Sequence, residues 1–291
     1  SRSPKRRSIK RGYYNSLMSD LRVLSLGAGV QSTTLALMIE HGEIPMVDCG
    51  IFADTKGEPQ NVYKHLDWLE KQLSYPIYRV TWRDLKQDIF DASRGMYKGF
   101  TAPFYTLSDQ GKKGILRRQC TADYKIKPVT KKIRELLGYK KGERVKKGTK
   151  VELIMGISYD ELFRMRENRL KYVQNIYPLV DKGIRRHNCL DWIKQKNYPQ
   201  PPRSACTFCP FHSNLEWRKI KENKEEWQEV VKMDKAIRDQ EEFKKSKYAE
   251  TIKDKLFLHN QRVPLDEVDL RTDEEKGQYS LLDECEGMCG V

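Results

Sequence analysis

The sequence predicts an α/β protein with a doubly wound parallel sheet and a cysteine-bearing helical C-terminal extension. Short apolar, β-rich runs alternate with segments whose apolar residues recur at helical spacing. Such alternation forms right-handed βαβ units, whose strands run parallel. From Pro199 onward the pattern changes to a turn with proline and cysteine and then to charged helices. Because ligands of doubly wound sheets bind at the carboxyl ends of the strands, we expect the functional residues there.

Four stretches have the composition of buried strands: 21–26, 46–53, 77–80 and 151–157. The loop 27–32 and then a helix over 33–41 follow the first of these strands. Pro59 is well placed to open a second helix. Segment 82–125 lacks periodicity and is long enough to be an active-site loop.

Several single residues also have a predicted place in this fold. Cys49 lies within an expected strand and is predicted to pack in the core. Asn188 is a plausible N-cap for a helix over 190–196, and Cys189 beside it is expected to pack. His187 and His259 are expected at the surface.

The length and composition exclude several classes of protein. With 291 residues the chain can bury a full core without disulfides, and its aromatic content of 10% is too high for a disordered chain. No run approaches the roughly 18 apolar residues of a membrane span, so we expect no membrane partner and a cytoplasmic location. Seven cysteines, an odd number, then favour metal, cluster or redox chemistry over a disulfide framework.

The chain is strongly basic, with a formal net charge of +14. Six of the first twelve residues are Lys or Arg, so residues 1–19 are expected to form a basic flexible arm. Such an arm can follow a nucleic-acid backbone, or it can be a tail without a ligand. The mixed Lys and Glu of 219–255 are typical of solvated helix faces.

A small-residue loop follows the first expected strand and is a candidate anion site. It reads Gly27-Ala28-Gly29-Val30-Gln31-Ser32 and leads into a helix, whose N-terminus favours negative charge. Small residues let a phosphate approach the backbone N–H groups. The loop is neither a Walker loop nor a dinucleotide fingerprint, and a tight turn without a ligand is the alternative.

This loop resembles the pyrophosphate loop Ser-Gly-Gly-x-Asp-Ser of the ATP pyrophosphatase superfamily, also called PP-loop or adenine nucleotide α-hydrolase-like. It is most similar to the phosphoadenosine-phosphosulfate (PAPS) reductase branch. Three further stretches resemble that branch in family order: Asp54-Thr55-Lys56-Gly57-Glu58, Cys120 to Pro128, and Gly156 to Arg164. The resemblance covers about residues 21–213 and implies a nucleotide-binding domain over 20–198, with 199–291 as a metal- or cluster-binding extension.

The resemblance implies that an adenine nucleotide, either ATP or a sulfonucleotide such as PAPS or adenylylsulfate, is bound, with Mg²⁺ as a further ligand. The residues that it assigns to this site are Ser25, Gly27, Ala28, Gly29, Val30, Gln31, Ser32, Asp54, Thr55, Glu58, Arg118, Lys125, Gly156, Asp160, Glu161 and Arg164. Basic members of this set suit sulfate and phosphate groups. Gln31 stands where ATP-cleaving members carry aspartate, which favours a sulfonucleotide.

The cysteines suggest a metal or cluster site. Cys206-Thr-Phe-Cys209 is a knuckle that can place two thiolates on one metal. Adenylylsulfate reductases hold a 4Fe-4S cluster with such a pair and an earlier cysteine pair, of which Cys120 is present here and Thr121 replaces the other. The open position could be filled by Cys289, another cysteine, or no protein ligand, as in tRNA thiolation and DNA phosphorothioation enzymes. Zinc is the alternative metal.

The last residues resemble the Glu-Cys-Gly-Leu-His tail of PAPS and adenylylsulfate reductases. In those enzymes the tail cysteine is the nucleophile, which makes Cys285 the catalytic candidate here and thioredoxin a candidate reductant. Cys285 and Cys289 could instead complete the metal site.

Three functions remain open at this point. The first is a PAPS reductase-like enzyme that carries out sulfur transfer or sulfonucleotide reduction with an iron–sulfur cluster. The second is an ATP-dependent enzyme that modifies a nucleic acid or nucleobase, by thiolation or a similar reaction. The third is a non-enzymatic, zinc-stapled module that binds nucleotide or nucleic acid.

Overall fold

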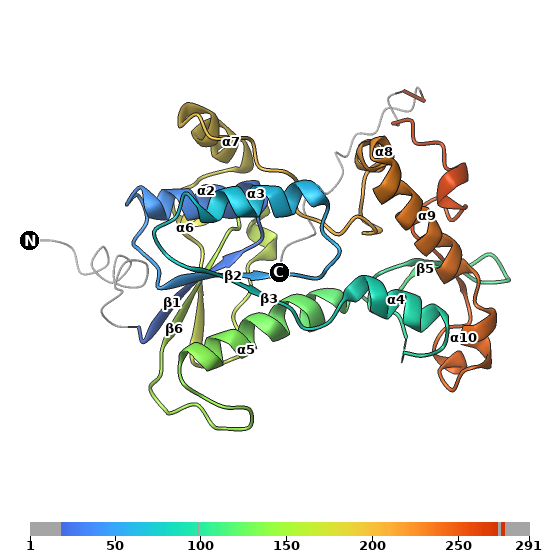
Figure 1. Ribbon diagram of the computed structural model, residues 1–291, viewed down its shortest axis with the longest axis horizontal. Coiled ribbons are helices and arrows are strands. Elements are labelled where there is room, and N and C mark those ends of the chain that lie inside the picture. Colours follow the sequence, from blue (N-terminus) through green and yellow to red (C-terminus); the bar gives the residue numbers. More distant parts are fainter. Residues whose placement is uncertain (1–18, 98, 273–274, 277–291) are drawn as a thin grey trace, which may run out of the picture. The chain divides into compact units, whose positions relative to one another are not determined.

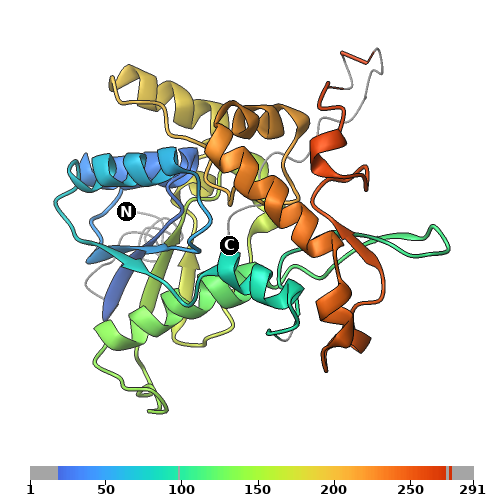
Figure 2. The ribbon, with the colours of Figure 1, turned by 45° about the vertical axis from the view of Figure 1, so that its right-hand side comes forward.

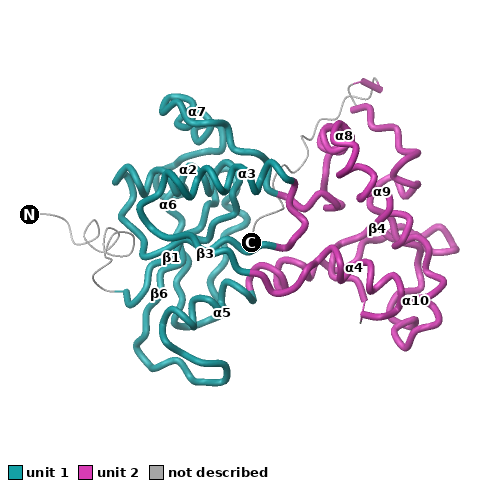
Figure 3. The backbone as a smooth tube through the Cα atoms, viewed as in Figure 1, with its two compact units in different colours: residues 1–54, 60–80, 127–204 teal, residues 55–59, 81–126, 205–291 magenta. Residues whose placement is uncertain are grey.

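The computed structural model describes residues 19–97, 99–272 and 275–276. The chain divides into two compact units (Figure 3). Unit 1 contains the described residues up to Asp54 together with Gln60–Val80 and Lys127–Ser204. Unit 2 contains Thr55–Pro59, Thr81–Ile126 and the described residues from Ala205 onward.

Unit 1 is built on a five-stranded parallel sheet with the strand order β3-β2-β1-β6-β7 (Figure 1). The strands are β1 (Leu21–Leu26), β2 (Cys49–Ala53), β3 (Ile77–Val80), β6 (Val151–Met155) and β7 (Val173–Ile176). The chain proceeds outward from β1 through β2 to β3 and then returns to the other side of β1 with β6. The topological switch point therefore lies between β1 and β6, where doubly wound sheets bind ligands. The predicted fold class is confirmed.

Both faces of this sheet are covered, and the side chains of β1 alternate between them. Leu24 and Leu26 pack with α2 (Val30–Glu40), α3 (Gln60–Glu70) and α7 (Arg186–Gln195). Leu21 and Val23 pack on the opposite face with α5 (Lys127–Leu136). Figures 1 and 2 show α2 and α3 on one face of the sheet and α5 on the other. Burial on both faces explains why β1, β2 and β6 are mostly apolar.

The boundaries of several elements differ from those expected. Helix α2 begins at Val30 rather than at Thr33, because Gly29 is its N-cap, so half of the small-residue loop is the first helical turn. Helix α7 begins at Arg186, and Asn188 caps it from the third helical position, with Oδ1 accepting from the Arg185 backbone N–H at 3.0 Å. Strand β7 was not predicted, because its four residues include Gln174 and Asn175.

Unit 2 has a different architecture, with helices and a small antiparallel sheet. Its helices are α4 (Leu85–Ser93), α8 (Asn214–Glu222), α9 (Lys224–Arg238) and α10 (Glu241–Lys245). The sheet order is β5-β4-β8, from β5 (Lys113–Ile115), β4 (Tyr105–Leu107) and β8 (Lys255–Phe257). The C-terminal part is therefore not purely helical. The expectation that 82–125 is irregular was wrong, since this segment forms α4, two strands and the π-helix η2 (Thr121–Ile126).

One core joins the two sequence segments of unit 2. Leu85 and Ile89 of α4 belong to the same buried cluster as Trp217 of α8 and Met233 of α9. This packing explains why 81–126, which the sequence analysis placed with the nucleotide-binding domain, forms one unit with the C-terminal residues.

The structure shows whether four single residues are buried or exposed as expected. The predicted core positions of Cys49 and Cys189 are confirmed, with 2% and 0% exposure, and His187 is exposed as predicted. The surface prediction for His259 was wrong, because only 2% of it is exposed. Its ring hydrogen-bonds Asn214 Oδ1 through Nε2 at 2.9 Å and accepts from the Gln261 backbone N–H at Nδ1 at 3.2 Å. Within the described part of the chain, no helix combines the length and apolarity that a bilayer span requires.

Candidate functional site

The loop after β1 is folded around the Ser32 side chain. Ser32 Oγ accepts from the Gly27 backbone N–H at 3.2 Å and donates to the Gly29 carbonyl oxygen at 3.3 Å. Between these contacts Ala28 is fully buried and has a φ of 57°. This left-handed conformation costs a residue with a side chain roughly 1–2 kcal/mol of conformational free energy, so contacts with the surrounding structure must hold the loop in this shape.

The N-terminus of α2 lacks a side-chain cap and lacks acidic residues in its first turn. The first intrahelical backbone bond runs from Thr33 N–H to the Gly29 carbonyl at 2.9 Å. Gly29 is not required by packing, since a Cβ there would meet its nearest neighbour, Ser204 Cβ, at 3.7 Å. A bare helix N-terminus behind small residues is a cradle for an anion.

Gly156, at the carboxyl end of β6, is required by packing. A Cβ at this position would stand 2.9 Å from both the backbone N and the Cα of Ser32. The chain after β6 therefore approaches the loop after β1 more closely than any other residue type allows. This approach places the stretch 156–164 against the phosphate-loop candidate, at the switch point of the sheet.

A chain of polar contacts joins the two strand ends. Gln31 Nε2 donates to Glu161 Oε2 at 3.2 Å, and Arg164 donates to Glu161 Oε1 at 2.6 Å. Only 6% of Glu161 is exposed. The amide and the guanidinium therefore both donate to one buried carboxylate beside the anion cradle.

The other two acidic residues assigned to this site in unit 1 each accept a hydrogen bond from a residue of a neighbouring helix. Asp54 is buried and its Oδ1 accepts from the Tyr63 hydroxyl of α3 at 2.8 Å. Asp160 accepts from the Arg186 backbone N–H at the start of α7, at 3.1 Å. Burial opposes ionisation of Asp160, but this bond and the one from Ser158 outweigh it and lower its pKa.

Two side chains that support this site were not predicted from the sequence. Ser158 is fully buried, and its Oγ accepts from Gln31 Nε2 at 3.4 Å. His65 of α3 contacts the helix behind the loop, with Nε2 3.0 Å from Thr33 Oγ1, and burial lowers its pKa to about 4. Ser158 lies within the stretch 156–164, which the sequence motifs indicated, so the sequence carried a signal for it. No sequence pattern pairs His65 with Thr33.

The cysteine knuckle belongs to unit 2. The Cys209 backbone N–H donates to the Cys206 carbonyl at 2.9 Å, and His212 Nε2 lies 2.9 Å from the same oxygen. The segment Thr55–Pro59 packs on this turn, since the Thr207 N–H donates to the Gly57 carbonyl at 2.8 Å. A Cβ on Gly57 would stand 2.7 Å from the Phe208 ring, so only glycine permits this contact.

Polar groups gather around the Cys206 thiol. Cys206 Sγ shares a hydrogen bond with Thr55 Oγ1 at 3.2 Å. Burial, and then the Glu58 carboxylate, raise the pKa of this thiol, while Lys125 acts in the opposite direction. Lys125 Nζ lies 3.7 Å from Glu58 Oε1, and Cys120 is near enough to raise the Cys206 pKa further. The structure therefore brings together five residues that the sequence assigned to two different ligands.

A second network fixes the π-helix η2, which carries Lys125. The Tyr124 hydroxyl and the Arg83 guanidinium both donate to the Asp88 carboxylate, which is buried on α4. Burial of Asp88 opposes ionisation, but these two donors outweigh it and lower its pKa. Nothing in the sequence indicated these partners, because Asp88 and Tyr124 are distant along the chain.

The cysteines do not form a complete metal centre among the described residues. No group of three His, Cys, Asp or Glu side chains there is placed to hold one metal ion. Cys285 and Cys289 lie outside the described residues, as do the basic residues of the N-terminal arm.

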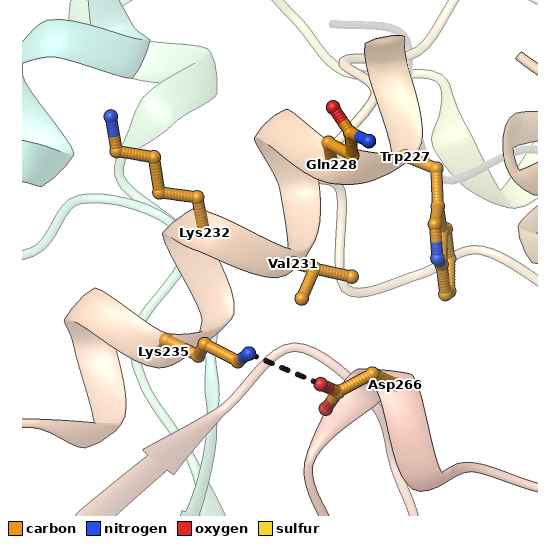
Figure 4. A pocket seen from close by; sticks show the side chains of 6 residues that line it. All are labelled: Trp227, Gln228, Val231, Lys232, Lys235 and Asp266. Atoms are coloured by element: carbon orange, nitrogen blue, oxygen red, sulfur yellow. Dashed lines mark ion pairs between the residues drawn. The ribbon is translucent and has the colours of Figure 1, made fainter. Parts of the chain in front are cut away.

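Two further features of unit 2 are the position of Arg118 and a hollow beside α9. Arg118 lies over the Phe211 ring, with Cζ 5.9 Å from its centroid, so its charge is stacked within unit 2. A hollow of about 370 Å³ beside α9 is lined by Trp227, Val231 and Lys235 among others, and Lys235 forms an ion pair with Asp266 at 3.3 Å. Figure 4 shows these side chains and the ion pair. The hollow contains none of the predicted site residues.

Comparisons with known proteins find similarity in structure but no match in sequence. No protein-family model matches the chain, and no curated protein matches it in sequence. Among solved structures, it is similar to phosphoadenylyl-sulfate (PAPS) reductase from Candida auris in its phosphate complex. The identity is 10%, the match covers 69% of this chain and 90% of that chain, and the TM-score is 0.43. The fold class rests on the strand order itself.

Proposed function

We propose that this protein is a PAPS reductase-like enzyme that binds an adenine nucleotide in unit 1 and carries out sulfur transfer or sulfonucleotide reduction. The observation that carries the proposal is the uncapped N-terminus of α2, behind small residues, at the switch point of a parallel sheet. The charged groups of the nucleotide would bind the N–H groups of this turn. Arg164 and Glu161 would border them on the side of β6.

The contacts of Gln31 support a sulfonucleotide over ATP cleavage. Its neutral amide donates to Glu161, whose charge is also balanced by Arg164. A carboxylate at position 31 would instead place two negative groups together and attract a divalent cation. With Gln31, the phosphates would be held by backbone donors and Arg164, without a metal at this position.

In the proposed reduction, the Cys285 thiolate attacks the sulfur of the sulfonucleotide. The new S–S bond forms as the S–O bond breaks, and the nucleotide phosphate leaves with the electron pair of that bond. A dithiol reductant such as thioredoxin then attacks Cys285 Sγ, sulfite leaves, and the reductant closes its own disulfide.

An iron–sulfur cluster on Cys120, Cys206 and Cys209, with Cys289 as a further ligand, is part of this proposal. It is supported by the gathering of Cys120, Cys206, Glu58 and Lys125 in unit 2. No step of the reaction is assigned to it, because the described side chains do not complete a metal centre. Iron and acid-labile sulfide in anaerobically purified protein would support the cluster, whereas stoichiometric zinc would support the stapled module instead.

Substitution of Gly29 tests the nucleotide site without disturbing the fold. The Cβ of Gly29→Ala meets no protein atom closer than 3.7 Å, so the melting temperature should not change. The methyl group would keep a phosphate from the backbone, so affinity for PAPS, adenylylsulfate or ATP should fall at least tenfold, measured by calorimetry. Ala28→Gly is the matched control: it removes a Cβ from the same loop and should keep nucleotide affinity.

Equal nucleotide affinity in Gly29→Ala and the unmodified protein would contradict the proposed site. The product then separates the candidate reactions. Sulfite released from PAPS in the presence of thioredoxin would favour reduction, and pyrophosphate released from ATP would favour activation of an acceptor. Sulfite release that persists in Cys285→Ser would exclude the tail nucleophile.

A further inference from the structure

The loop that joins α5 to β6 carries a concentrated positive charge. Residues 138–150 contain one acidic side chain, Glu143, and six basic ones: Lys140, Lys141, Arg144, Lys146, Lys147 and Lys150. All six are exposed. Within the described residues none of their charged groups takes part in an ion pair. Lys171, also exposed, borders the same surface.

Hydrogen bonds hold this loop in a defined shape. The Arg134 guanidinium of α5 donates to the carbonyl oxygens of Lys140 and Glu143, at 3.1 and 2.5 Å. The Glu143 carboxylate accepts from the Lys140 backbone N–H at 2.6 Å, so the one acid of the loop is engaged with its backbone. The Lys146 backbone N–H donates to the Tyr139 hydroxyl at 3.0 Å. The basic side chains are therefore displayed from a fixed backbone, which lowers the entropy lost on binding.

Part of the loop lines an open hollow of about 430 Å³. Its basic lining residues are Arg144, Lys146 and Lys147 of the loop together with Lys171. A concave surface lined by several cations can contact an anionic chain along its length.

The position of the loop separates it from the nucleotide-site candidate. Backbone bonds from Asp20 N–H to the Lys150 carbonyl, and from Lys150 N–H to Asp20 Oδ2, both 2.7 Å, tie the loop to the start of β1 (Figure 1). The phosphate-loop candidate follows the other end of β1, a strand of six residues. The two surfaces therefore lie on opposite edges of the sheet, about 20 Å apart.

We propose that residues 138–150, with Lys171, bind the phosphate backbone of a nucleic acid. Closely spaced cations release the condensed counterions of a polyphosphate chain, and this release drives binding. The helices of unit 2 differ, because there Lys alternates with Glu. A membrane surface would require apolar side chains that insert, and the loop offers only the half-buried Val145. RNA and DNA share the phosphate chemistry that this surface recognises.

Charge reversal on the loop tests this proposal in the full chain. The variant Lys141→Glu/Arg144→Glu/Lys147→Glu changes only exposed side chains that make no described hydrogen bond. Binding would be measured by fluorescence anisotropy with labelled 30-nucleotide RNA and DNA, single-stranded and duplex, between 50 and 300 mM KCl. We expect at least tenfold weaker binding and a log–log salt slope about 2–3 smaller than that of the unmodified chain.

The matched control, Lys219→Glu/Lys221→Glu/Lys224→Glu, makes the same change in net charge on the mixed-charge surface of α8 and α9. It should bind within about threefold of the unmodified chain. A second control deletes residues 1–18 and should retain most of the binding. Equal losses in both triple variants, loss only on deletion of the arm, or no binding by the unmodified chain would each overturn the proposal.

The probe that binds most tightly identifies whether the phosphates belong to RNA or to DNA. Preferential binding of either one supports the proposed binding surface. Affinity of the loop variant for PAPS or ATP should not change, since those ligands are assigned to the opposite edge of the sheet. Loss of nucleotide binding and loss of nucleic-acid binding are therefore separate results. Binding of a nucleic acid would favour a nucleic-acid acceptor over free sulfite as the destination of the sulfur.

Discussion

Gln31 is the residue that most restricts the chemistry of unit 1. Its amide connects the first turn of α2 to Glu161 and, through that carboxylate, to Arg164. This arrangement satisfies a buried negative charge with two donors. It also leaves the edge of the anion cradle without an additional carboxylate that could recruit a divalent metal.

Gln31→Glu should convert this site into a metal-dependent one. Two carboxylates would then stand about 3 Å apart, and like charges at that distance raise the pKa of one of them or bind a cation. We expect sulfonucleotide affinity at pH 8 to fall at least tenfold in EDTA and to recover with Mg²⁺. Calorimetric titrations with and without Mg²⁺ measure this.

Gln31→Met is the control, because it keeps the side-chain volume and adds no charge. It should weaken binding equally with and without Mg²⁺. A requirement of the unmodified protein for Mg²⁺ at micromolar nucleotide would contradict this account of Gln31.

Strands β1 and β6, which carry the site, are joined at their amino ends by a buried ion pair. Arg22 and Glu152 are register partners, with Nε and Oε2 2.9 Å apart, and their side chains are 2% and 10% exposed. Burial raises the Glu152 pKa even though Arg22 acts against the rise. The attraction therefore does not fully offset the cost of removing the charges from water.

Removing one charge of this pair should lower the free energy of unfolding much more than replacing both residues with apolar ones. Glu152→Gln removes the register-paired carboxylate from the buried Arg22 guanidinium and should lower the free energy of unfolding by about 3 kcal/mol. Arg22→Met combined with Glu152→Leu should stay within about 1 kcal/mol of the unmodified protein. Urea denaturation of the three proteins tests both values, and a double variant less stable than Glu152→Gln would disprove the interpretation.

The molecule as a whole carries one buried, neutral histidine in each unit. Burial lowers the pKa of His65 in unit 1 and of His259 in unit 2, each to about 4. The hydrogen bond from the Gln261 backbone N–H to His259 Nδ1 requires that this nitrogen stay unprotonated. The unfolded chain binds protons at both histidines below about pH 6.5, whereas the folded chain does not until about pH 4.

Stability should therefore be complete above about pH 6.5 and fall as the pH drops toward 4. The loss is at most about 1.4 kcal/mol per pH unit for each histidine. Urea midpoints at pH 7.5 and 5.0 should differ less in His65→Gln and in His259→Gln than in the unmodified protein. His187→Gln, at an exposed position, should not alter the difference, and a similar null effect of His65→Gln would refute the assignment.

The fold of unit 1 could be predicted because its signals are local. Strands buried on both faces are mostly apolar, as Leu21–Leu26 and Val151–Met155 are, and the small residues after them mark turns. Strand β7 escaped prediction because it is short and half polar. The segment 82–125 was misjudged because its helix and strands acquire their burial from the distant C-terminal helices.

The candidate site was predictable as a set of stretches, not as a set of contacts. The motifs indicated the loop 27–32 and the stretch 156–164, since small and charged residues after strands are visible in the sequence. The pairing of Gln31 with Glu161, and of Cys206 with Thr55, depends on side-chain directions that no spacing rule gives.

By itself the sequence determined the α/β class, the anion-loop candidate, the excess of positive charge and the cysteine knuckle. Only the tertiary structure decided that Gly156 must be glycine, that His259 is buried, and that all six cations of loop 138–150 are exposed. The physical reason is the range of the interactions. Backbone propensity and hydrophobic period act over a few residues, whereas close approach, burial and charge clustering arise between segments that only the folded chain brings together.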